Sequence, residues 1–121
     1  MHVRKKSLKE DIAVIKGDRI YLFFVIIEIN ICAVDGLENR LLTRNKAEVK
    51  PGFHRLAVKY NLFSYSVKIS ANFDLLINVE AGHEYKISEK GSCIDVIDTT
   101  SGTLVTRSPL NQYNIFSLYS I

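Results

Sequence analysis

Apolar and polar residues alternate with a period of two along most of the chain. Residues 27–33 read Ile-Glu-Ile-Asn-Ile-Cys-Ala, and residues 73–79 read Phe-Asp-Leu-Leu-Ile-Asn-Val. This alternation is typical of strands that bury one face. The nearest helical candidate, residues 37–48, is short and polar and has no clear cap. The pattern predicts strands over residues 11–16, 19–34 with a break near the middle, 46–49, 53–60, 64–70, 72–79, 83–88, 92–97 and 103–107.

Turn residues separate these runs at a fairly regular spacing. Glycine supplies positive φ and proline presets φ, so such pairs favour tight turns. Many short strands at this spacing predict an all-β fold, a small antiparallel β-sandwich of about 7–9 strands. The turn signals are Gly17-Asp18, Asp35-Gly36, Pro51-Gly52, Asn61, Ala81-Gly82, Lys90-Gly91 and Ser101-Gly102.

A length of 121 residues suits one domain with one core. We expect residues 1–10 to form a basic, flexible tail and residues 11–107 to form the β-sandwich domain. Residues 108–121 keep several apolar side chains, so we expect them to pack on the domain or at a partner. This C-terminal segment could add an edge strand, cover one, or contact another chain.

Charge and composition exclude few function classes. The formal net charge is +3, and its most basic cluster is Arg4, Lys5, Lys6 and Lys9, for which a solvated tail is the simplest reading. Exposed aromatic residues are not interleaved with basic ones, so nucleic-acid binding is not expected. Cys32 and Cys93 are too few for a disulfide framework, and we expect two free thiols.

The most apolar stretch covers residues 20–34. It is too short to span a membrane as a helix, and it contains Glu28 and Asn30. Its β-branched and aromatic residues suit a buried strand. The segment before it is long and of mixed charge, so we expect neither a transmembrane segment nor an export signal in the chain as written.

Two segments place a glycine shortly before a histidine that begins a strand. They read Pro-Gly-Phe-His from Pro51 and Ala-Gly-His-Glu-Tyr from Ala81. The alternation puts His54 on the face of Leu56, and His83 on the face of Tyr85. We expect each ring to close one end of the core and to hydrogen-bond to a loop carbonyl.

The alternative is a metal or hydrolytic site that uses His54 and His83. Zinc usually takes at least three protein ligands, and the sequence has no HxH, HExxH or Cys–His spacing to supply them. Phosphate-binding and nucleophile-elbow motifs are absent as well. No catalytic residue, cofactor or metal is therefore predicted. The carboxylates Asp35, Glu80, Asp95 and Asp98 are expected to be solvated, at turns or on outward strand positions.

An ordered set of motifs resembles small bacterial envelope lipoproteins and related β domains, broadly similar to PEGA-type repeats. In that pattern a strand ends in a VDG-like turn, a PGxHxφxVxY unit leads the next hairpin, an AGHxYxφ unit follows, and a closing hairpin ends in TGxxV. The motifs here are AVIKG (13–17), INICAVDG (29–36), VKPGFHRLAVKY (49–60), NVEAGHEYKIS (78–88) and IDVIDTTSGTLV (94–105).

The resemblance covers about 90 residues, and it implies a β-sandwich in the cell envelope, often lipid-anchored and not known for catalysis. The positions that match these motifs are expected to have structural roles, at turns and at the ends of the core. Such lipoproteins begin with an apolar signal and a cysteine, and neither precedes Asp11. The expected location is periplasmic or outer-membrane-associated by resemblance, or cytoplasmic if Met1 is the true start. The architectural positions are Asp35, Gly36, Pro51, Gly52, His54, Gly82, His83, Tyr85 and Gly102.

We therefore predict a non-catalytic, envelope-associated β-sandwich module that binds a protein or cell-wall partner. An exposed edge strand can pair with an extended partner segment, and the segment with Tyr21, Phe23 and Phe24 is the first candidate. The alternatives are the histidine-based metal or hydrolytic protein and a structural subunit of an assembly. A homo-oligomer could form through an edge strand or the C-terminal segment.

Overall fold

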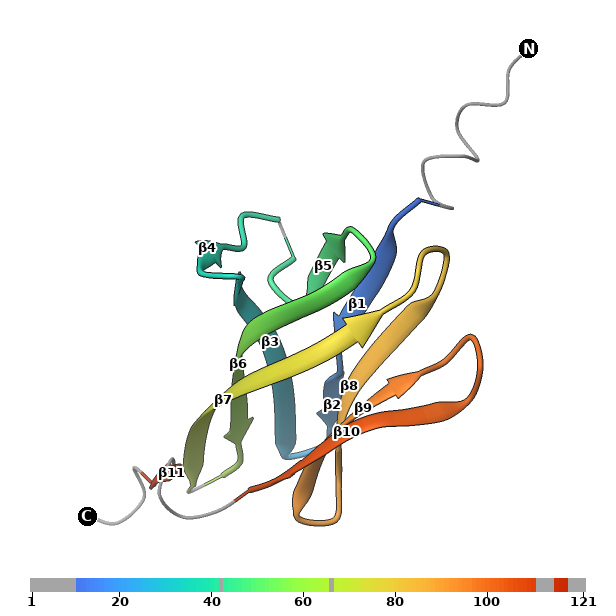
Figure 1. The fold of residues 1–121 in the computed structure, drawn as a ribbon. Helices are drawn as coiled ribbons and strands as arrows, with labels where there is room; N and C mark the ends of the chain where they lie inside the picture. Colours follow the sequence, from blue (N-terminus) through green and yellow to red (C-terminus); the bar gives the residue numbers. More distant parts are fainter. Residues whose placement is uncertain (1–10, 42, 66, 111–114, 118–121) are drawn as a thin grey trace.

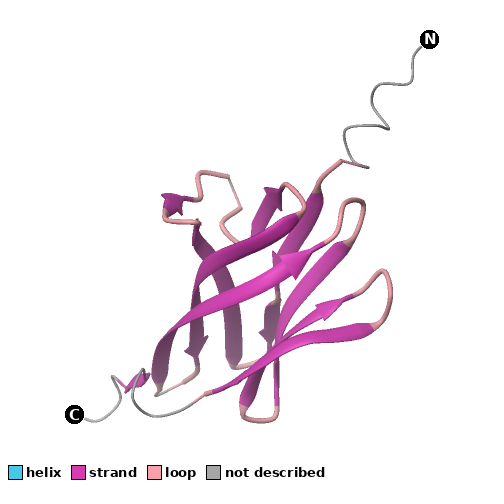
Figure 2. Cartoon of the chain, in the orientation of Figure 1, coloured by secondary structure: helices cyan, strands magenta, loops and turns pink. Residues whose placement is uncertain are grey.

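The computed structural model describes residues 11–41, 43–65, 67–110 and 115–117. This part of the chain contains strands and loops and no helix (Figure 2). The strands are β1 (Ala13–Gly17), β2 (Arg19–Leu22), β3 (Val25–Val34), β4 (Leu37–Glu38), β5 (Lys46–Val49), β6 (Gly52–Phe63), β7 (Lys68–Val79), β8 (Glu84–Lys90), β9 (Cys93–Asp98), β10 (Thr103–Pro109) and β11 (Ile115–Ser117).

The strands form two sheets that face each other (Figure 1). One sheet has five strands in the order β10-β9-β8-β1-β5. The other has six, in the order β11-β7-β6-β3-β2, with β4 paired to β3. The predicted β-sandwich is thus confirmed, although β1 and β8 pair in parallel and break the antiparallel rule.

The strand count exceeds the prediction because two very short strands, β4 and β11, carry no alternation of their own. Residues 37–48, the nearest helical candidate, instead hold β4, a loop and β5. β11 pairs antiparallel with β7, so part of the C-terminal segment adds an edge strand within the same chain. The predicted N-terminal tail, residues 1–10, lies outside the described residues.

The longest hairpin joins β6 and β7. Their register runs without a break from Gly52 opposite Val79 to Phe63 opposite Lys68. The separate strand predicted over residues 64–70 and the turn predicted at Asn61 are therefore wrong. The chain turns between the end of β6 at Phe63 and the start of β7 at Lys68, and Asn61 stays in the strand, where its Oδ1 accepts a 2.6 Å hydrogen bond from Ser70 on β7.

The chain changes sheets between β1 and β2, at Gly17-Asp18. This pair was predicted as a turn, but it is the bend where one extended segment leaves the first sheet and enters the second. The Asp18 amide donates to Ile87 O in the first sheet, and Asp18 O accepts from Ile29 in the second. A Cβ on Gly17 would lie 2.1 Å from Ile29 O, so the two backbones approach too closely for any other residue.

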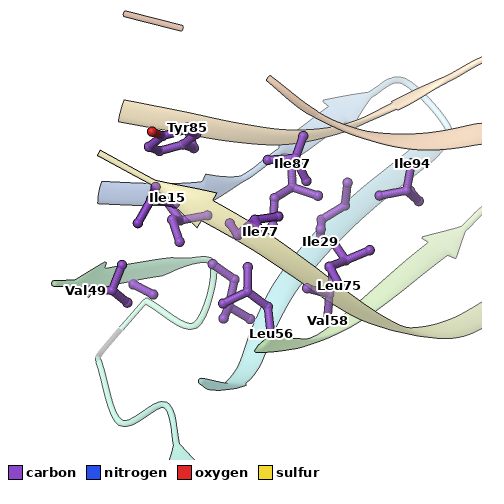
Figure 3. Packing of buried hydrophobic residues seen from close by; sticks show 14 of the residues in the cluster. Ile15, Ile29, Val49, Leu56, Val58, Leu75, Ile77, Tyr85, Ile87 and Ile94 are labelled. Atoms are coloured by element: carbon purple, nitrogen blue, oxygen red, sulfur yellow. The ribbon is translucent and has the colours of Figure 1, made fainter. Parts of the chain in front are cut away.

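The two sheets share one apolar core (Figure 3). The alternation explains its composition, because every second residue of β6 and β7 turns inward. Ile15 and Ile87 contribute from one sheet and Ile29 and Leu56 from the other, and all four are fully buried. The predicted break inside residues 19–34 is also present, as the β2–β3 turn at Phe23 and Phe24.

Two carboxylates depart from the sequence-based expectation. Asp95 and Asp98 are 1% and 4% exposed, whereas solvated positions were predicted. Arg107 on β10 binds Asp95 with two hydrogen bonds of 2.7 and 2.8 Å. A buried carboxylate needs such a partner, and the partner lies twelve residues away in sequence, so alternation could not reveal it.

Candidate functional site

His54 joins two turns at one end of the sandwich. Its ring begins the inward face of β6 and is largely buried. Nδ1 lies 2.6 Å from Oδ2 of Asp35 in the β3–β4 turn, and Nε2 lies 2.6 Å from the carbonyl of Lys50 in the β5–β6 turn. The hydrogen bond to a loop carbonyl expected from the sequence is thus present, and a carboxylate occupies the second nitrogen.

Asp35 is held in place from two sides. Its Oδ1 accepts a 2.9 Å hydrogen bond from the backbone amide of Arg55, whose carbonyl accepts the Asp35 amide. The Arg55 amide and then the His54 ring keep the pKa of Asp35 below its usual value. Asp35 has φ of 53°, a left-handed conformation that aspartate tolerates better than most residues, and Gly36 follows at 83°.

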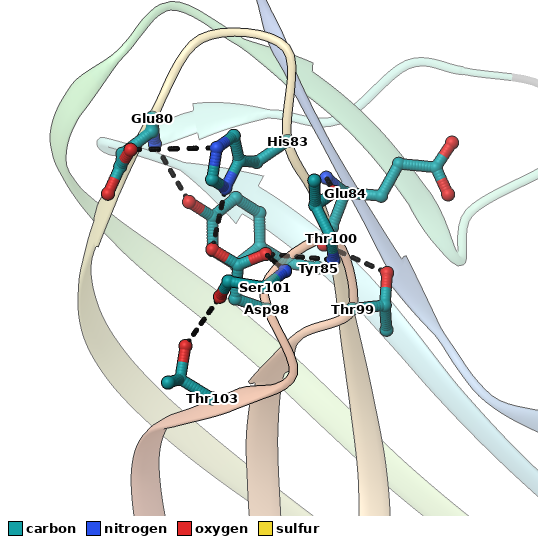
Figure 4. A network of polar contacts seen from close by, with 9 residues as sticks. All are labelled: Glu80, His83, Glu84, Tyr85, Asp98, Thr99, Thr100, Ser101 and Thr103. Atoms are coloured by element: carbon teal, nitrogen blue, oxygen red, sulfur yellow. Dashed lines mark hydrogen bonds and ion pairs between the residues drawn. The ribbon is translucent and has the colours of Figure 1, made fainter.

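His83 lies in the β7–β8 turn, one residue before β8 (Figure 4). The predicted strand position is therefore wrong by one residue, and the ring contacts two carboxylates where a loop carbonyl was expected. Nδ1 lies 2.7 Å from Oδ2 of Asp98 at the end of β9, and Nε2 lies 3.5 Å from Oε1 of Glu80. Oδ1 of Asp98 accepts the amides of Thr100 and Ser101 and so shapes the β9–β10 turn. The imidazole thereby ties the β7–β8 turn to the β9–β10 turn.

The hydrogen bond between His83 and Asp98 shifts the pKa values of both residues in opposite directions. The hydrogen bond to Asp98 raises the pKa of His83 above its usual value, although partial burial opposes this. Burial raises the pKa of Asp98, but the hydrogen bonds from His83 and Ser101 outweigh it, so that pKa is lower than usual. Burial also raises the pKa of Tyr85, whose hydroxyl oxygen accepts a 2.8 Å hydrogen bond from the Glu80 amide.

The remaining predicted positions shape turns beside the two histidines. Gly52, which follows Pro51, has φ of 119°, and Gly82 has φ of 81° and donates its amide to Ile12 O. Gly102 closes the β9–β10 turn with a hydrogen bond to Asp98 O. Side chains at these φ values are strained, which explains the glycines.

The two histidine clusters hold neighbouring turns together. The two rings share no carboxylate among the described residues: His54 contacts Asp35, and His83 contacts Asp98 and Glu80. The Ser101 hydroxyl, nearest to a nucleophile in this network, lies 2.6 Å from the Thr103 hydroxyl. In the part of the chain that the structure describes, no three His, Cys, Asp or Glu residues are placed to hold a metal ion.

A shallow depression of ≈ 330 Å³ lies beside the His54 cluster. Its lining includes Asp35, Leu37, Asn39 and Leu41. Asp35 is engaged by His54 and Arg55, and the Asn39 amide donates to Ile31 O and Lys46 O. The polar groups here hold loops together rather than converging on a ligand.

The exposed apolar side chains gather elsewhere, on the β2–β3 hairpin. All four residues of β2 are exposed, and β2 is the outermost strand of its sheet among the described residues. The turn adds Phe23 and Phe24, whose ring centroids lie 4.8 Å apart, and Phe24 contacts Tyr65 of the β6–β7 turn at 5.4 Å. The sequence singled out Tyr21, Phe23 and Phe24, but it missed Tyr65, because that residue was expected inside a strand.

Comparison with protein-family models, with curated proteins and with solved structures gave no match. The resemblance to envelope lipoprotein domains therefore stays a prediction. Across residues 11–41, 43–65, 67–110 and 115–117, no helix reaches the length and hydrophobicity needed to cross a membrane. Both cysteines, Cys32 and Cys93, are free, as expected.

Proposed function

We propose that this chain is a non-catalytic binding module of the bacterial cell envelope that captures a protein or cell-wall partner at the edge of β2. The observation that carries the proposal is the exposure of this edge. All of Arg19–Leu22 is exposed, including Tyr21 at 61% and Leu22 at 62%. Isolated edges of this kind are normally covered or charged in a monomer.

The chemistry of β2 favours an extended peptide as the occupant. β3 takes one row of its backbone groups, and the other row is available to an added strand. The side chains of β2 alternate between the two faces of the sheet. Ile20 and Leu22 lie on one face, and Arg19 and Tyr21 lie on the other. A partner segment with alternating apolar residues and a carboxylate opposite Arg19 would match this edge.

A binding role also accounts for the polar clusters. The ring nitrogens of His54 and His83 contact groups in turns. The carboxylates of Asp35 and Asp98 each accept several hydrogen bonds. Such committed groups support a scaffold more readily than a reaction centre. The envelope location rests on the resemblance of the turn-and-strand motifs.

Retention of an envelope extract on the immobilised protein, followed by hydrogen exchange with the isolated partner, tests this proposal. Ile20→Lys places a charge on the edge, and we expect it to abolish retention. The matched control is Leu104→Lys, because Leu104 is 50% exposed on β10, an outer strand of the other sheet.

The expected result has two parts. A partner is retained by the wild type and by Leu104→Lys but not by Ile20→Lys, and its binding slows amide exchange in residues 19–22. Equal retention by both variants, or slowed exchange confined to other strands, would show that the β2 edge is not the binding surface.

A further inference from the structure

Exposed aromatic side chains cluster at the β2–β3 and β6–β7 turns, at one end of the sandwich. We call the side chains of Tyr21, Phe23, Phe24 and Tyr65 the aromatic end. Phe23 is 91% exposed and Tyr65 is 85% exposed, yet the rings of Phe23, Phe24 and Tyr65 contact one another in series. Large aromatic groups that cluster in exposed turns mark an interaction site.

The outer face of the sheet changes from apolar to polar within a short distance of this end. The strand registers place Tyr21, Ile26, Phe63 and Lys68 in one row across β2, β3, β6 and β7. Two residues further from the turns, the row is Arg19, Glu28, Asn61 and Ser70. Two residues of a strand span about 7 Å.

This depth matches the interface of a lipid bilayer. Amphipathic surfaces that bind membranes bury their apolar side about 5–10 Å into the headgroup region. Phenylalanine would then lie deepest, while the tyrosines and the Lys68 ammonium group would lie at headgroup level. Lys68 already extends over the Phe63 ring, with its Nζ 5.1 Å from the centroid.

The charges around the aromatic end favour an anionic surface. Lys68 at the beginning of β7 and Lys90 at the end of β8 are both exposed, and the β8–β9 turn lies at the same end of the molecule as the β2–β3 turn (Figure 1). The nearby Glu89 is part-buried and accepts a hydrogen bond from Tyr60. The exposed carboxylates Asp35 and Glu80 belong to the β3–β4 and β7–β8 turns, and these turns lie at the opposite end of the molecule (Figure 1).

We propose that the aromatic end docks on the surface of an anionic phospholipid bilayer. Phe23 and Phe24 insert between the acyl chains, and Lys68 and Lys90 contact lipid phosphates. The exposed apolar side chains and the lysines beside them match the acyl chains and the phosphates of such a surface. Tyr21 belongs to both the aromatic end and the β2 edge, but the insertion depends on Phe23 and Phe24 in the β2–β3 turn. The edge variant Ile20→Lys leaves these two residues intact, so the two proposals can be tested separately.

The absence of tryptophan from the sequence permits a direct test with two single-tryptophan proteins. Phe23→Trp reports from the aromatic end. Phe53→Trp is its matched control, since Phe53 is 71% exposed at the beginning of β6. Each full-length variant is mixed with vesicles of phosphatidylglycerol and phosphatidylcholine, or of phosphatidylcholine alone, at low and high salt.

We expect the emission of Phe23→Trp to shift to the blue with anionic vesicles and to be quenched by brominated acyl chains, while Phe53→Trp stays unchanged. Phe23→Ser and Phe24→Ser should each lower the affinity for vesicles, measured by co-sedimentation, by about tenfold. These residues are exposed, so the thermal melting curves should match that of the wild type. Added salt should weaken binding.

Three results would overturn the proposal. The first is an unchanged Phe23→Trp spectrum with no sedimentation of the wild type. The second is equal binding to neutral and anionic vesicles, which would remove the role of the lysines. The third is a dimer in vesicle-free sedimentation velocity that Phe23→Ser dissolves, which would make the aromatic end a contact between two copies.

Discussion

His83 shows how a single side chain connects distant parts of this fold. Its backbone carbonyl accepts the amide of Val14 in β1, and its ring joins Glu80 to Asp98. Nearby, Glu84 in β8 exchanges hydrogen bonds with Thr99 and Thr100. These contacts hold the β7–β8 and β9–β10 turns together, and the charge on the imidazole contributes to that link.

The stability of the protein should depend on pH through this pair. The pKa of His83 is raised in the folded state, so the protonated ring stabilises the fold fully below the unfolded pKa near about 6.5. This contribution disappears as the pH rises through the folded pKa. We expect His83→Gln to lower the melting temperature more at pH 6 than at pH 9, measured by circular dichroism. Glu84→Gln, which alters an exposed neighbour, should show no such trend.

The lowered pKa of Asp98 affects the stability of the fold at acidic pH. Its contribution is present above the unfolded pKa and is lost as the pH falls through the lower, folded pKa. The pair is therefore most stabilising in mildly acidic solution. A difference between wild type and His83→Gln that stays constant from pH 6 to pH 9 would contradict the assigned ion pair.

At the residue scale, the sequence predicted which side chains face the core, because this follows from alternation. It did not predict contacts between residues that are distant in sequence. Alternation placed His54 on the inward face of β6, as the structure has it, whereas His83, predicted to begin a strand, lies in the turn one residue before β8. It could not indicate that Asp98 would be buried against His83, because that contact depends on how two hairpins lie in space. The run Asp-Thr-Thr-Ser-Gly from Asp98 was the available signal, since aspartate often caps such a turn with its side chain.

At the scale of elements, the passage from β1 to β2 determines which sheet each strand joins. The amides and carbonyls around Gly17 bond to both sheets, and only glycine leaves room for Ile29 O. The sequence showed a Gly-Asp pair and suggested a turn. A change of sheet and a turn use similar residues, so composition alone could not separate them.

Gly17→Ala should destabilise the fold by about 2–3 kcal/mol, because backbone atoms must shift to accommodate the Cβ. Urea unfolding followed by far-ultraviolet circular dichroism measures this loss. Lys16→Ala serves as the control, since Lys16 is exposed on the same strand, and it should change the free energy of unfolding by less than about 0.5 kcal/mol. Similar stability of Gly17→Ala and the wild type would mean that the two backbones do not meet at this point.

For the whole molecule, one core joins both sheets and should make unfolding cooperative. Ile87 is fully buried in the five-stranded sheet, and Ile29 is fully buried in the six-stranded sheet. Both belong to the same apolar cluster, which also includes Tyr85 (Figure 3). The sequence predicted this sandwich from alternation and turn spacing, but it did not predict the parallel pairing of β1 with β8, two strands that lie far apart in the sequence.

Ile87→Ala should lower the free energy of unfolding by about 2–5 kcal/mol, as expected for a large buried side chain. Leu76→Ala, at a 59% exposed position, should lower it by less than about 0.5 kcal/mol. Both variants should keep a single transition in urea, monitored by tyrosine fluorescence and circular dichroism together. Two separate transitions would indicate that the sheets unfold independently.

The most direct test of the proposed function is photo-crosslinking in the native cell from a benzophenone side chain. We place it at Tyr21 on the β2 edge and, as a control, at Phe53, which is similarly exposed on β6. Crosslinks from position 21 to a protein or cell-wall component, without counterparts from position 53, are the predicted result, whereas crosslinks to lipid alone would support only the docking of the aromatic end on a bilayer. No crosslink from position 21, or the same products from both positions, would contradict a partner at the edge of β2.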